Sequence, residues 1–493
     1  MLNINNNTSR LKREILVRIA KLQLEGKLAE GVNSIPKELA PVDSNPIRCC
    51  IYHDREILMH RVIARLGCGL EDYNDEKRLA EYVQEALNRE KPTWPMHTVL
   101  DLACNACVRS HFMVTNACLA CVARPCLVNC GRKAIEIKEG RARIDSDKCV
   151  SCGLCLQNCP YHAIIKIPVP CEESCPVGAI TKNESGRECI DYHKCINCGN
   201  CMRECPFGAM MDKSQLVDVI KHIMNKKNVV AMYAPAVAAQ FRVEPGRLDG
   251  ALLAAGFSNV VEVALGADIT ADKEAAEFAE RMEKGDKMMT TSCCPAYVRA
   301  VRRHVPELAD CISVTSTPMH YTAEIAKKEY PGCITVFIGP CLAKRREGMD
   351  DELVDYVISI EELGALFVAK EIDAAQAAPA PKNRLPTSTG RNFAKSGGVA
   401  QAVKARLKDP SILKETVIDG LDKAGMKRLA EFGKIHTGKL PYTDDTPNLI
   451  EVMTCQGGCI AGPSVITNPK VALTQLAKYA EAGEPVNNKD NAG

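Results

Sequence analysis

The sequence predicts an α/β domain in the C-terminal part of the chain, preceded by a cysteine-rich region and a helical N-terminal region. Three observations predict this order. Apolar residues recur at three- and four-residue intervals near the N-terminus, most of the 27 cysteines crowd into the next segment, and apolar runs alternate with helical stretches after it. We therefore expect three regions, at residues 1–95, 96–212 and 213–493.

Composition limits the class of protein. The 493 residues are 46% hydrophobic, which is enough for a sizeable core, and the net charge of +2 indicates binding neither to nucleic acid nor to an anionic membrane. No stretch approaches the ~20 consecutive apolar residues of a membrane span. The N-terminus lacks the apolar core and cleavage site of a signal peptide, so we expect a cytoplasmic protein.

The N-terminal region has helical periodicity at residues 11–28 and 75–90. Cys49, Cys50 and Cys68 lie in this region without the spacing of metal ligands, and we expect them to be packed thiols. A reducing cytoplasm argues against disulfide bonds between them.

The C-terminal region combines apolar runs with helical stretches, a pattern typical of an α/β fold with buried strands. We expect helices at residues 272–284 and 407–425. The expected strands lie at residues 229–237, 260–265, 333–340 and 448–453.

Cysteines in the middle region follow the spacing of bacterial ferredoxins. The run C-x2-C-x2-C-x3-C-P that begins at Cys149 is typical of two-cluster ferredoxins, in which the fourth cysteine binds the other cluster. A partner run begins at Cys118. Structural zinc is the alternative, but zinc would favour separate groups of four without the trailing Cys-Pro. Crossing the fourth cysteines predicts one [4Fe–4S] cluster on Cys118, Cys121, Cys126 and Cys159 and another on Cys149, Cys152, Cys155 and Cys130.

A third run begins at Cys195, and its partner is incomplete. If Cys104 and Cys107 supply the missing C-x-x-C, one ferredoxin unit is inserted inside another. The alternative is a three-cluster region with Cys104 and Cys107 unligated or serving elsewhere. Cys189 is left over, and we expect it to be structural. The outer unit then predicts clusters on Cys195, Cys198, Cys201 and Cys175 and on Cys104, Cys107, Cys171 and Cys205.

Three further cysteine motifs follow apolar runs of the α/β region, where strand ends gather functional sites. The first is TSCCPAY, which contains Cys293 and Cys294; the second is GPCLAKRRE, which contains Cys341. The third is EVMTCQGGC, with Cys455 and Cys459, and its paired glycines would let the backbone approach a metal closely. Four of these cysteines could bind one more cubane cluster.

The three motifs resemble the signatures TSCCP, PCxxKxxE and ExMxCxGGC of [FeFe]-hydrogenases, and the match extends from about residue 100 to 465. The resemblance implies an α/β catalytic domain of the iron-only hydrogenase large-subunit type behind ferredoxin-like domains. It also implies an H-cluster, a [4Fe–4S] cluster bridged to a diiron subsite that carries CO, CN⁻ and a dithiolate. The cubane ligands would be Cys294, Cys341, Cys455 and Cys459, of which Cys459 bridges to the diiron subsite.

The resemblance assigns further residues to the same site. Lys344 would donate a hydrogen bond to a cyanide, Pro235 and Ala236 would line the pocket, and Met453 would pack beside the diiron subsite. Cys293 would pass protons to the dithiolate amine, because a thiol has a pKa that is easily tuned. The remaining proton path would consist of Glu274, Ser313, Glu277 and Arg281. The alternative for the two glutamates is a solvated, charged helix face.

Four places depart from the best-known members of the family. Ala296 and Tyr297 stand for Gly and Trp, Gly339 for Met, Met319 for Gln, and GCIAGPS replaces the usual ending GGGQP. Together with CCIYHDR near the N-terminus, these differences resemble the group B branch. They alter the surroundings that tune a metal centre, so the sequence leaves catalytic bias and oxygen tolerance open.

The resemblance implies the reversible reaction 2 H⁺ + 2 e⁻ ⇌ H2, with H2 and protons as substrates. Four accessory clusters, or three without Cys104 and Cys107, would relay electrons to ferredoxin or a similar low-potential carrier. Loading the site would require H-cluster maturation proteins. Alternatives are a hydrogen sensor, a hydrogenase-like iron–sulfur assembly factor, and a polyferredoxin. No signalling domain is evident, which argues against a sensor. Intact Cys293, Lys344 and Glu347 argue against an assembly factor, and the long α/β region argues against a polyferredoxin.

Overall fold

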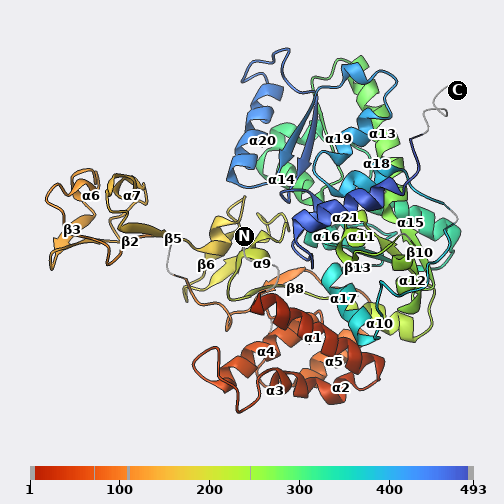
Figure 1. Cartoon of the computed structure of the whole chain (residues 1–493), viewed down its shortest axis with the longest axis horizontal. Coiled ribbons are helices and arrows are strands. Elements are labelled where there is room, and N and C mark those ends of the chain that lie inside the picture. The colour runs from red at the N-terminus through yellow and green to blue at the C-terminus, as the bar shows by residue number, and fades with distance from the viewer. Residues whose placement is uncertain (1–5, 72, 108–110, 245, 383, 487–493) are drawn as a thin grey trace.

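The computed structural model describes residues 6–71, 73–107, 111–244, 246–382 and 384–486. Residues 1–5 and 487–493, at the outer ends of the predicted regions, lie outside this description. An α/β body, a helical base and a small lobe that stands off to one side are visible in Figure 1. None of the described helices is long and apolar enough to cross a membrane.

The α/β body contains two parallel sheets, as expected from its apolar runs. One sheet has the strand order β10-β9-β12-β13 and the other the order β11-β15-β14. Every residue of β9 and β15 is buried, which explains why these strands are continuous apolar runs in the sequence. The strands are β9 (Val229–Tyr233), β10 (Asn259–Glu262), β11 (Met289–Thr290), β12 (Ile334–Gly339), β13 (Tyr356–Ser359), β14 (Glu415–Asp419) and β15 (Leu449–Met453).

Helices surround both sheets and join successive parallel strands (Figure 1). They are α10 (Leu216–Met224), α11 (Pro235–Phe241), α12 (Arg247–Ala254), α13 (Val263–Glu283), α14 (Pro295–His304), α15 (Pro318–Glu329), α16 (Leu342–Asp350), α17 (Ile360–Ala369), α18 (Ser388–Arg391), α19 (Gly398–Lys404), α20 (Lys423–His436) and α21 (Pro469–Glu481).

The prediction of a helix at residues 407–425 is wrong for most of this segment. The segment forms a short turn at Pro410–Ile412, then β14, and only its end belongs to α20. Pro410 interrupts a helix, and the β-branched Thr416, Val417 and Ile418 suit a strand. The strand pairs in parallel with β15, so an edge position in a sheet decided the conformation of an ambiguous segment.

The cysteine-rich region is built from nested strand pairs. β1 pairs with β8 and encloses the whole region, whereas β2 pairs with β5 and encloses the lobe with α6 and α7 (Figure 1). This pairing agrees with one ferredoxin unit inserted inside another. The elements are β1 (His97–Val99), β2 (His111–Val114), α6 (Pro125–Val128), β3 (Ile135–Lys138), β4 (Arg141–Ile144), α7 (Leu154–Asn158), β5 (Ile164–Ile167), α8 (Pro170–Glu173), β6 (Ile180–Lys182), β7 (Glu188–Ile190), α9 (Asn200–Glu204) and β8 (Met210–Asp212).

The first C-x-x-C loop of each of the four cysteine runs, at Cys104, Cys118, Cys149 and Cys195, has the same backbone conformation. The residue before the second cysteine has a left-handed conformation, with φ of 45° at Ala106, 50° at Ala120, 54° at Ser151 and 58° at Asn197. This conformation costs energy for residues other than glycine, least for Asn. Its recurrence indicates that a tight turn, which brings the two cysteines to one side, is needed at each loop.

The N-terminal region is helical, as expected, but the prediction that its cysteines are packed is wrong for two of them. Cys49 and Cys50 are exposed rather than packed, because they end a solvent-exposed loop directly before α4. Cys68 is half-buried and donates to the carbonyl of Tyr82. The helices are α1 (Asn7–Leu24), α2 (Leu28–Gly31), α3 (Ile35–Leu39), α4 (Ile51–Arg65) and α5 (Leu79–Asn88).

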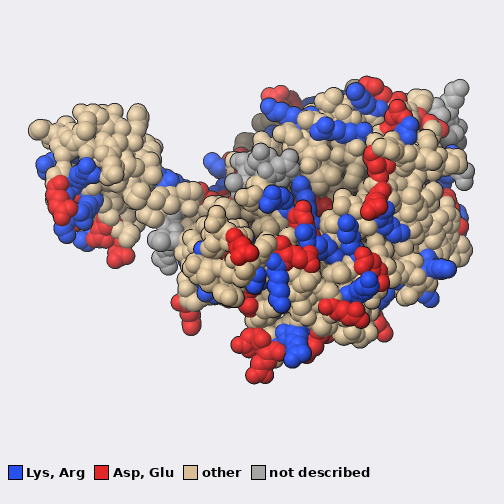
Figure 2. All heavy atoms as spheres, turned by 60° about the horizontal axis from the view of Figure 1, so that its bottom comes forward, with Lys and Arg blue, Asp and Glu red and all other residues tan. Residues whose placement is uncertain are grey.

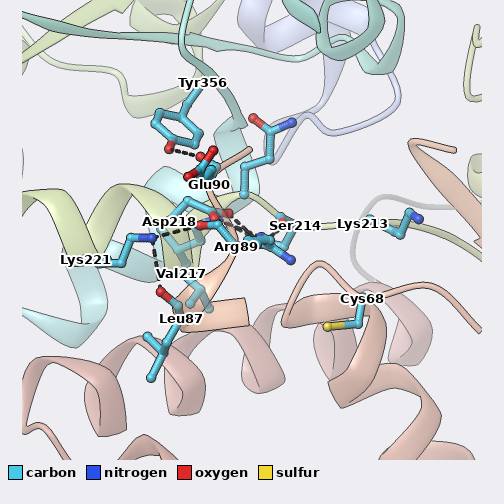
Figure 3. Close-up of polar contacts among 12 residues, drawn as sticks. Cys68, Leu87, Arg89, Glu90, Lys213, Ser214, Val217, Asp218, Lys221 and Tyr356 are labelled. Atoms are coloured by element: carbon cyan, nitrogen blue, oxygen red, sulfur yellow. Dashed lines mark hydrogen bonds and ion pairs between the residues drawn. The ribbon is translucent and has the colours of Figure 1, made fainter. Parts of the chain in front are cut away.

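A buried polar cluster attaches the helical base to the α/β body, as Figure 3 shows. Arg89, just after α5, forms an ion pair with Asp218 of α10, and the Asp218 side chain is completely buried. Lys221 donates to the carbonyls of Leu87 and Arg89, each over 3.1 Å. Tyr356 of β13 donates to the carbonyl of Glu90. These contacts fix the connection between α5 and the α/β body.

We expect Asp218→Asn to destabilise the protein, because it leaves the Arg89 guanidinium buried without a counter-charge. Removing one partner of a buried ion pair costs about 3 kcal/mol, which lowers the melting temperature by several degrees. Glu244→Gln is the control, since the ion pair of Glu244 with Arg247 is exposed and contributes little. Equal melting temperatures of the two variants would contradict this account of the junction.

Candidate active site

The three motifs of the α/β region sit at the carboxyl ends of three strands. Cys293 and Cys294 follow β11, Cys341 follows β12, and Cys455 follows β15. Pro235 and Ala236 begin α11 directly after β9. Since the strands of each sheet are parallel, their carboxyl ends lie at one edge of that sheet, and segments that follow strands of both sheets meet at a single cavity.

One cavity collects the predicted site residues. It leaves about 880 Å³ free of protein atoms. Its other walls are mainly apolar and include Val263, Ala267, Phe337 and Phe393. The predicted residues that line it are Cys293, Cys294, Cys341, Cys455, Cys459, Lys344, Pro235, Ala236 and Met453.

The thiols in this cavity are costly to ionise unless a cation lies beside them. Burial, reinforced by neighbouring cysteines, raises the pKa of Cys341 to about 11 and that of Cys459 to about 12. Burial and the same neighbours also raise the pKa of Cys455 well above its ordinary value. Thiolates this close in a dry cavity require a positively charged centre between them, so the donor set fits an iron–sulfur core.

Lys344 projects into the cavity from the first turn of α16. Burial disfavours its charge, but Glu347 more than offsets this effect, and the pKa of Lys344 is raised. Its Nζ lies 2.8 Å from Oε2 of Glu347 and donates to Oγ1 of Thr317 over 3.0 Å. A charged ammonium fixed by two partners is suited to hold an anionic or strongly dipolar ligand.

Helix α16 is itself held by a buried charge network. Arg345, which follows Lys344, pairs with Glu362 of α17 and, over 3.1 Å, with Asp212 of β8. Asp212 also pairs with Arg65 of α4 over 2.9 Å. The base, the cysteine-rich region and the catalytic body therefore converge one residue away from Lys344.

Cys293 and Glu274 form the inner end of the predicted proton path. Burial raises the pKa of Cys293 well above its ordinary value, and the Glu274 carboxylate adds to this effect. Burial raises the pKa of Glu274 to about 7. The backbone N–H of Ser292 donates to Oε1 of Glu274 over 3.0 Å, whereas Oε2 has no hydrogen-bond partner among the described residues. A buried carboxyl with one unused oxygen is suited to carry a proton.

The outer end of the path is built around Glu277, one turn further along α13. Ser313 donates to Oε2 of Glu277 over 2.6 Å, and Arg281 pairs with Oε1 over 2.8 Å. Thr315, which the sequence analysis did not select, donates to the same Oε2. Ser313 and Thr315 line a surface groove, so hydrogen-bonding groups extend from the cavity to solvent.

The inner ferredoxin cysteines form the two crossed groups that their spacing predicts. Cys130, Cys149, Cys152 and Cys155 line one cavity of about 380 Å³. A second cavity of about 340 Å³ is lined by Cys118, Cys121, Cys126 and Cys159. Within the described ranges, no three His, Cys, Asp or Glu side chains are close enough to hold a single metal ion. The cysteines surround empty space instead, as ligands of a larger cluster would.

The outer cysteines lie close together, and Cys171 is a neighbour of Cys201 as well as of Cys107 and Cys205. Burial raises the pKa of Cys201 well above its ordinary value, and Cys198, Cys195 and Cys175 raise it further. Burial likewise raises the pKa of Cys107, to which Cys104 and Cys205 add. Cys171 packs in the same apolar cluster as these cysteines, and Cys189 lies on β7 beside Thr181.

Cys198 connects the accessory and catalytic cysteines, because it also lines the catalytic cavity. The group with Cys175, Cys195 and Cys201 is therefore the accessory group nearest to the active site. The sequence offered no sign of this contact, since the two segments are far apart along the chain.

The positions that depart from familiar sequences have different surroundings. Ala296 and Met319 line the cavity, whereas the buried Tyr297 donates to Thr290 outside it. A Cβ atom at Gly339 would lie 2.6 Å from the ring of Phe337, so a larger residue there requires that ring to move. The buried Glu451 accepts from the N–H groups of Gly397 and Ala400 and fixes the start of α19.

Comparisons with known proteins agree with this arrangement. Residues 227–463 match the family model described as iron only hydrogenase large subunit, C-terminal domain. Residues 142–165 match a 4Fe-4S binding domain, and residues 170–209 match a 4Fe-4S dicluster domain. The predicted fold class, an iron-only hydrogenase α/β domain behind ferredoxin-like domains and a helical N-terminal region, is confirmed.

Several hydrogenases are similar to this chain. It is 28% identical over 321 residues to iron hydrogenase 1 of Clostridium pasteurianum, a match of 53% of this chain and 54% of that protein. The NADP-reducing hydrogenase subunit HndD of Solidesulfovibrio fructosivorans is 30% identical over 312 residues, or 52% of this chain and 53% of that subunit. The chain thus spans about half the length of these two relatives.

A third relative matches over most of its own length. The periplasmic [Fe] hydrogenase large subunit of Nitratidesulfovibrio vulgaris is 30% identical over 376 residues, which cover 65% of this chain and 85% of that subunit. Together with the family model and with the strand-end cysteines that share one cavity, this similarity shows that the chain belongs to the iron-only hydrogenase family.

Proposed function

We propose that this chain is an [FeFe]-hydrogenase that catalyses the reversible reaction 2 H⁺ + 2 e⁻ ⇌ H2. One observation carries the proposal: cysteines from three strand ends, the buried Lys344 and the thiol of Cys293 share a single apolar cavity. The cavity is large enough for a cluster, and its thiols need positive charge beside them. Both features support an H-cluster at this place.

The cofactor would be held by residues from all three motifs. Cys294, Cys341, Cys455 and Cys459 are the proposed cubane ligands, and Cys459 is the proposed bridge to the diiron subsite. When bound, the H-cluster supplies a redox-active iron site at which protons and electrons combine. Lys344 would bind a cyanide ligand, while Pro235, Ala236 and Met453 would pack against the diiron subsite and exclude water.

The protein would deliver protons through Cys293 and through side chains of α13 and its neighbours, where Ser313 and Arg281 already contact Glu277. Cys293 would exchange a proton with the cofactor and with Glu274, and Ser313, Glu277 and Arg281 would continue the path to the surface groove. The unused Oε2 of Glu274 supports its role as a carrier, because it can take a proton without breaking an existing hydrogen bond.

Electrons would travel through four accessory [4Fe–4S] clusters. The group nearest the catalytic cavity contains Cys198, and the protruding lobe holds the two inner groups. Figure 2 shows that much of the visible surface of this lobe is free of charged side chains, and Leu119, Val122 and Tyr161 beside its cysteines are exposed. We propose that a ferredoxin or similar low-potential carrier docks there in the cytoplasm.

The identity of the electron carrier has a second candidate. The relative HndD is named as an NADP-reducing hydrogenase subunit, so a subunit that delivers electrons to a nicotinamide is the alternative partner. Maturation proteins would be required in either case, because the diiron subsite carries CO and CN⁻.

We expect Cys293→Ala to lower hydrogen evolution at least a hundredfold, because general acid–base groups contribute on that order. The iron content should stay unchanged, since Cys293 is not a proposed ligand. The measurement is hydrogen evolution from reduced viologen after loading with a synthetic diiron complex. Cys333→Ala is the control, because Cys333 is buried outside the cavity. Full activity of Cys293→Ala would refute the proton-transfer role.

We expect Glu274→Gln to change the pH dependence of stability. The folded pKa of about 7 lies above the unfolded value, so wild-type stability falls as the pH rises from about 4.5 to 7, whereas Gln does not titrate. The stability of the variant relative to wild type should therefore rise by about 3 kcal/mol between pH 4.5 and 8. Melting temperatures of both proteins at the two pH values would test this; a constant difference would contradict it.

The fourth accessory cluster can be tested by iron content. We expect Cys104→Ala to lose about four iron atoms per chain, because a [4Fe–4S] cluster needs its cysteine ligands. Cys189→Ala is the matched control, since Cys189 belongs to none of the four groups and should bind wild-type iron. If Cys104→Ala retained all its iron, the three-cluster alternative would be correct.

A further inference from the structure

A buried histidine contacts the accessory cysteines that lie nearest to the catalytic cavity. His97, on β1, is 1% exposed, and its Nε2 lies 3.7 Å from Sγ of Cys195. Cys195 belongs to the group that includes Cys198, which lines the catalytic cavity. An N–H that points at this sulfur would act on the cluster that exchanges electrons with the active site.

A neighbouring amide decides which nitrogen of His97 carries the hydrogen. Nη1 of Arg299 donates to Oδ1 of Asn197 over 2.7 Å, and a guanidinium can only donate, so Oδ1 must face Arg299. Nδ2 of Asn197 then lies 3.5 Å from Nδ1 of His97. Because an amide NH2 can only donate, Nδ1 accepts, and the hydrogen of the neutral ring sits on Nε2, directed at Cys195.

This arrangement is specific to one of the first C-x-x-C loops of the four cysteine runs. Asn197 occupies the left-handed position before the second cysteine, where the other loops have Ala106, Ala120 and Ser151. None of these three residues has an amide. The backbone conformation is therefore common to all four loops, whereas an amide side chain at this position occurs only in the loop that begins at Cys195.

The orienting arginine comes from the catalytic half of the chain. Arg299 lies on α14, the helix that begins directly after the proposed ligand Cys294. A series of contacts therefore connects the catalytic domain to the proposed accessory cluster, in the order Arg299, Asn197, His97 and Cys195. Tyr192 completes the frame, since its hydroxyl donates to the carbonyl of His97 over 2.8 Å.

We propose that His97 is a positioning residue that donates its Nε2–H to the Cys195 thiolate and raises the midpoint potential of the cluster on Cys175, Cys195, Cys198 and Cys201. The proposal rests on the proposed function, because it requires a [4Fe–4S] cluster at these cysteines. Reduction adds a negative charge to a cluster that four thiolates already make anionic. A hydrogen-bond donor at sulfur stabilises the more negative, reduced form.

The test is a redox titration of the full-length chain with its [4Fe–4S] clusters, followed by electron paramagnetic resonance. His97→Phe keeps a ring but removes the N–H. We expect one of the titrating components to move to lower potential, with a roughly tenfold smaller ratio of reduced to oxidised cluster at fixed potential. For one electron this corresponds to about 59 mV. The other components should not move.

Tyr192→Phe is the matched control, because it removes a hydrogen bond to His97 but none to sulfur, and its potentials should equal those of wild type. Asn197→Gly keeps a residue that accepts the left-handed backbone and frees Nδ1 to take the hydrogen, so it should shift the same component in the same direction by less. This second variant carries the test if His97→Phe does not fold.

Two results would overturn the inference: unchanged potentials in the folded variants of His97 and Asn197, or an equal shift in Tyr192→Phe. Iron analysis separates this failure from that of the proposed function. A wild-type chain without iron at these cysteines would contradict both proposals, whereas full iron with unmoved potentials would contradict only the role of His97.

Discussion

The structure depends on one constraint, which is that sulfurs from three distant strand ends must meet in a single dry cavity. Parallel strands satisfy this constraint because the carboxyl ends within each sheet lie at one edge, and residues that follow β9, β11, β12 and β15 all line the cavity. Moving β11, β12 or β15 would remove a proposed ligand, and moving β9 would remove Pro235 and Ala236 from the cavity wall. The two sheets, their covering helices and the buried Arg345 network can be understood as the frame that holds these ends in place.

Electrostatics explains why such a cavity calls for a cofactor. Burial raises the pKa of its thiols, and each additional thiolate raises that of its neighbours. A cationic iron–sulfur core would reverse this penalty. In the same dry surroundings, Glu347 keeps Lys344 charged, so Lys344 is a strong hydrogen-bond donor. Burial raises the pKa of Glu274 to about 7, so this side chain can both accept and release a proton near neutral pH.

The cysteine-rich region meets a different requirement, because its cysteine groups must lie in series for the proposed electron transfer. Nesting the β2–β5 unit inside the span closed by β1–β8 places the two inner cysteine groups in the lobe, whereas Cys198 of the outer unit lines the cavity. The left-handed residue in the first C-x-x-C loop of each run makes a tight turn that brings its two cysteines to one side. Because the geometry of the loops is uniform, differences between clusters depend on surrounding side chains such as His97 and Asn197.

Spacing in the sequence predicted the cysteine groups and the buried strands, because ligand spacing and apolar periodicity are local properties that no distant contact changes. The residues around the cavity were predicted from the resemblance of three motifs to those of [FeFe]-hydrogenases. Tertiary structure alone decided the rest. Residues 415–419 became a strand through pairing with β15, and Cys49 and Cys50 became exposed through the loop before α4. The contact of Cys198 with the catalytic cavity and the orientation of His97 by Arg299 join segments far apart in the chain, so only folding could bring them together.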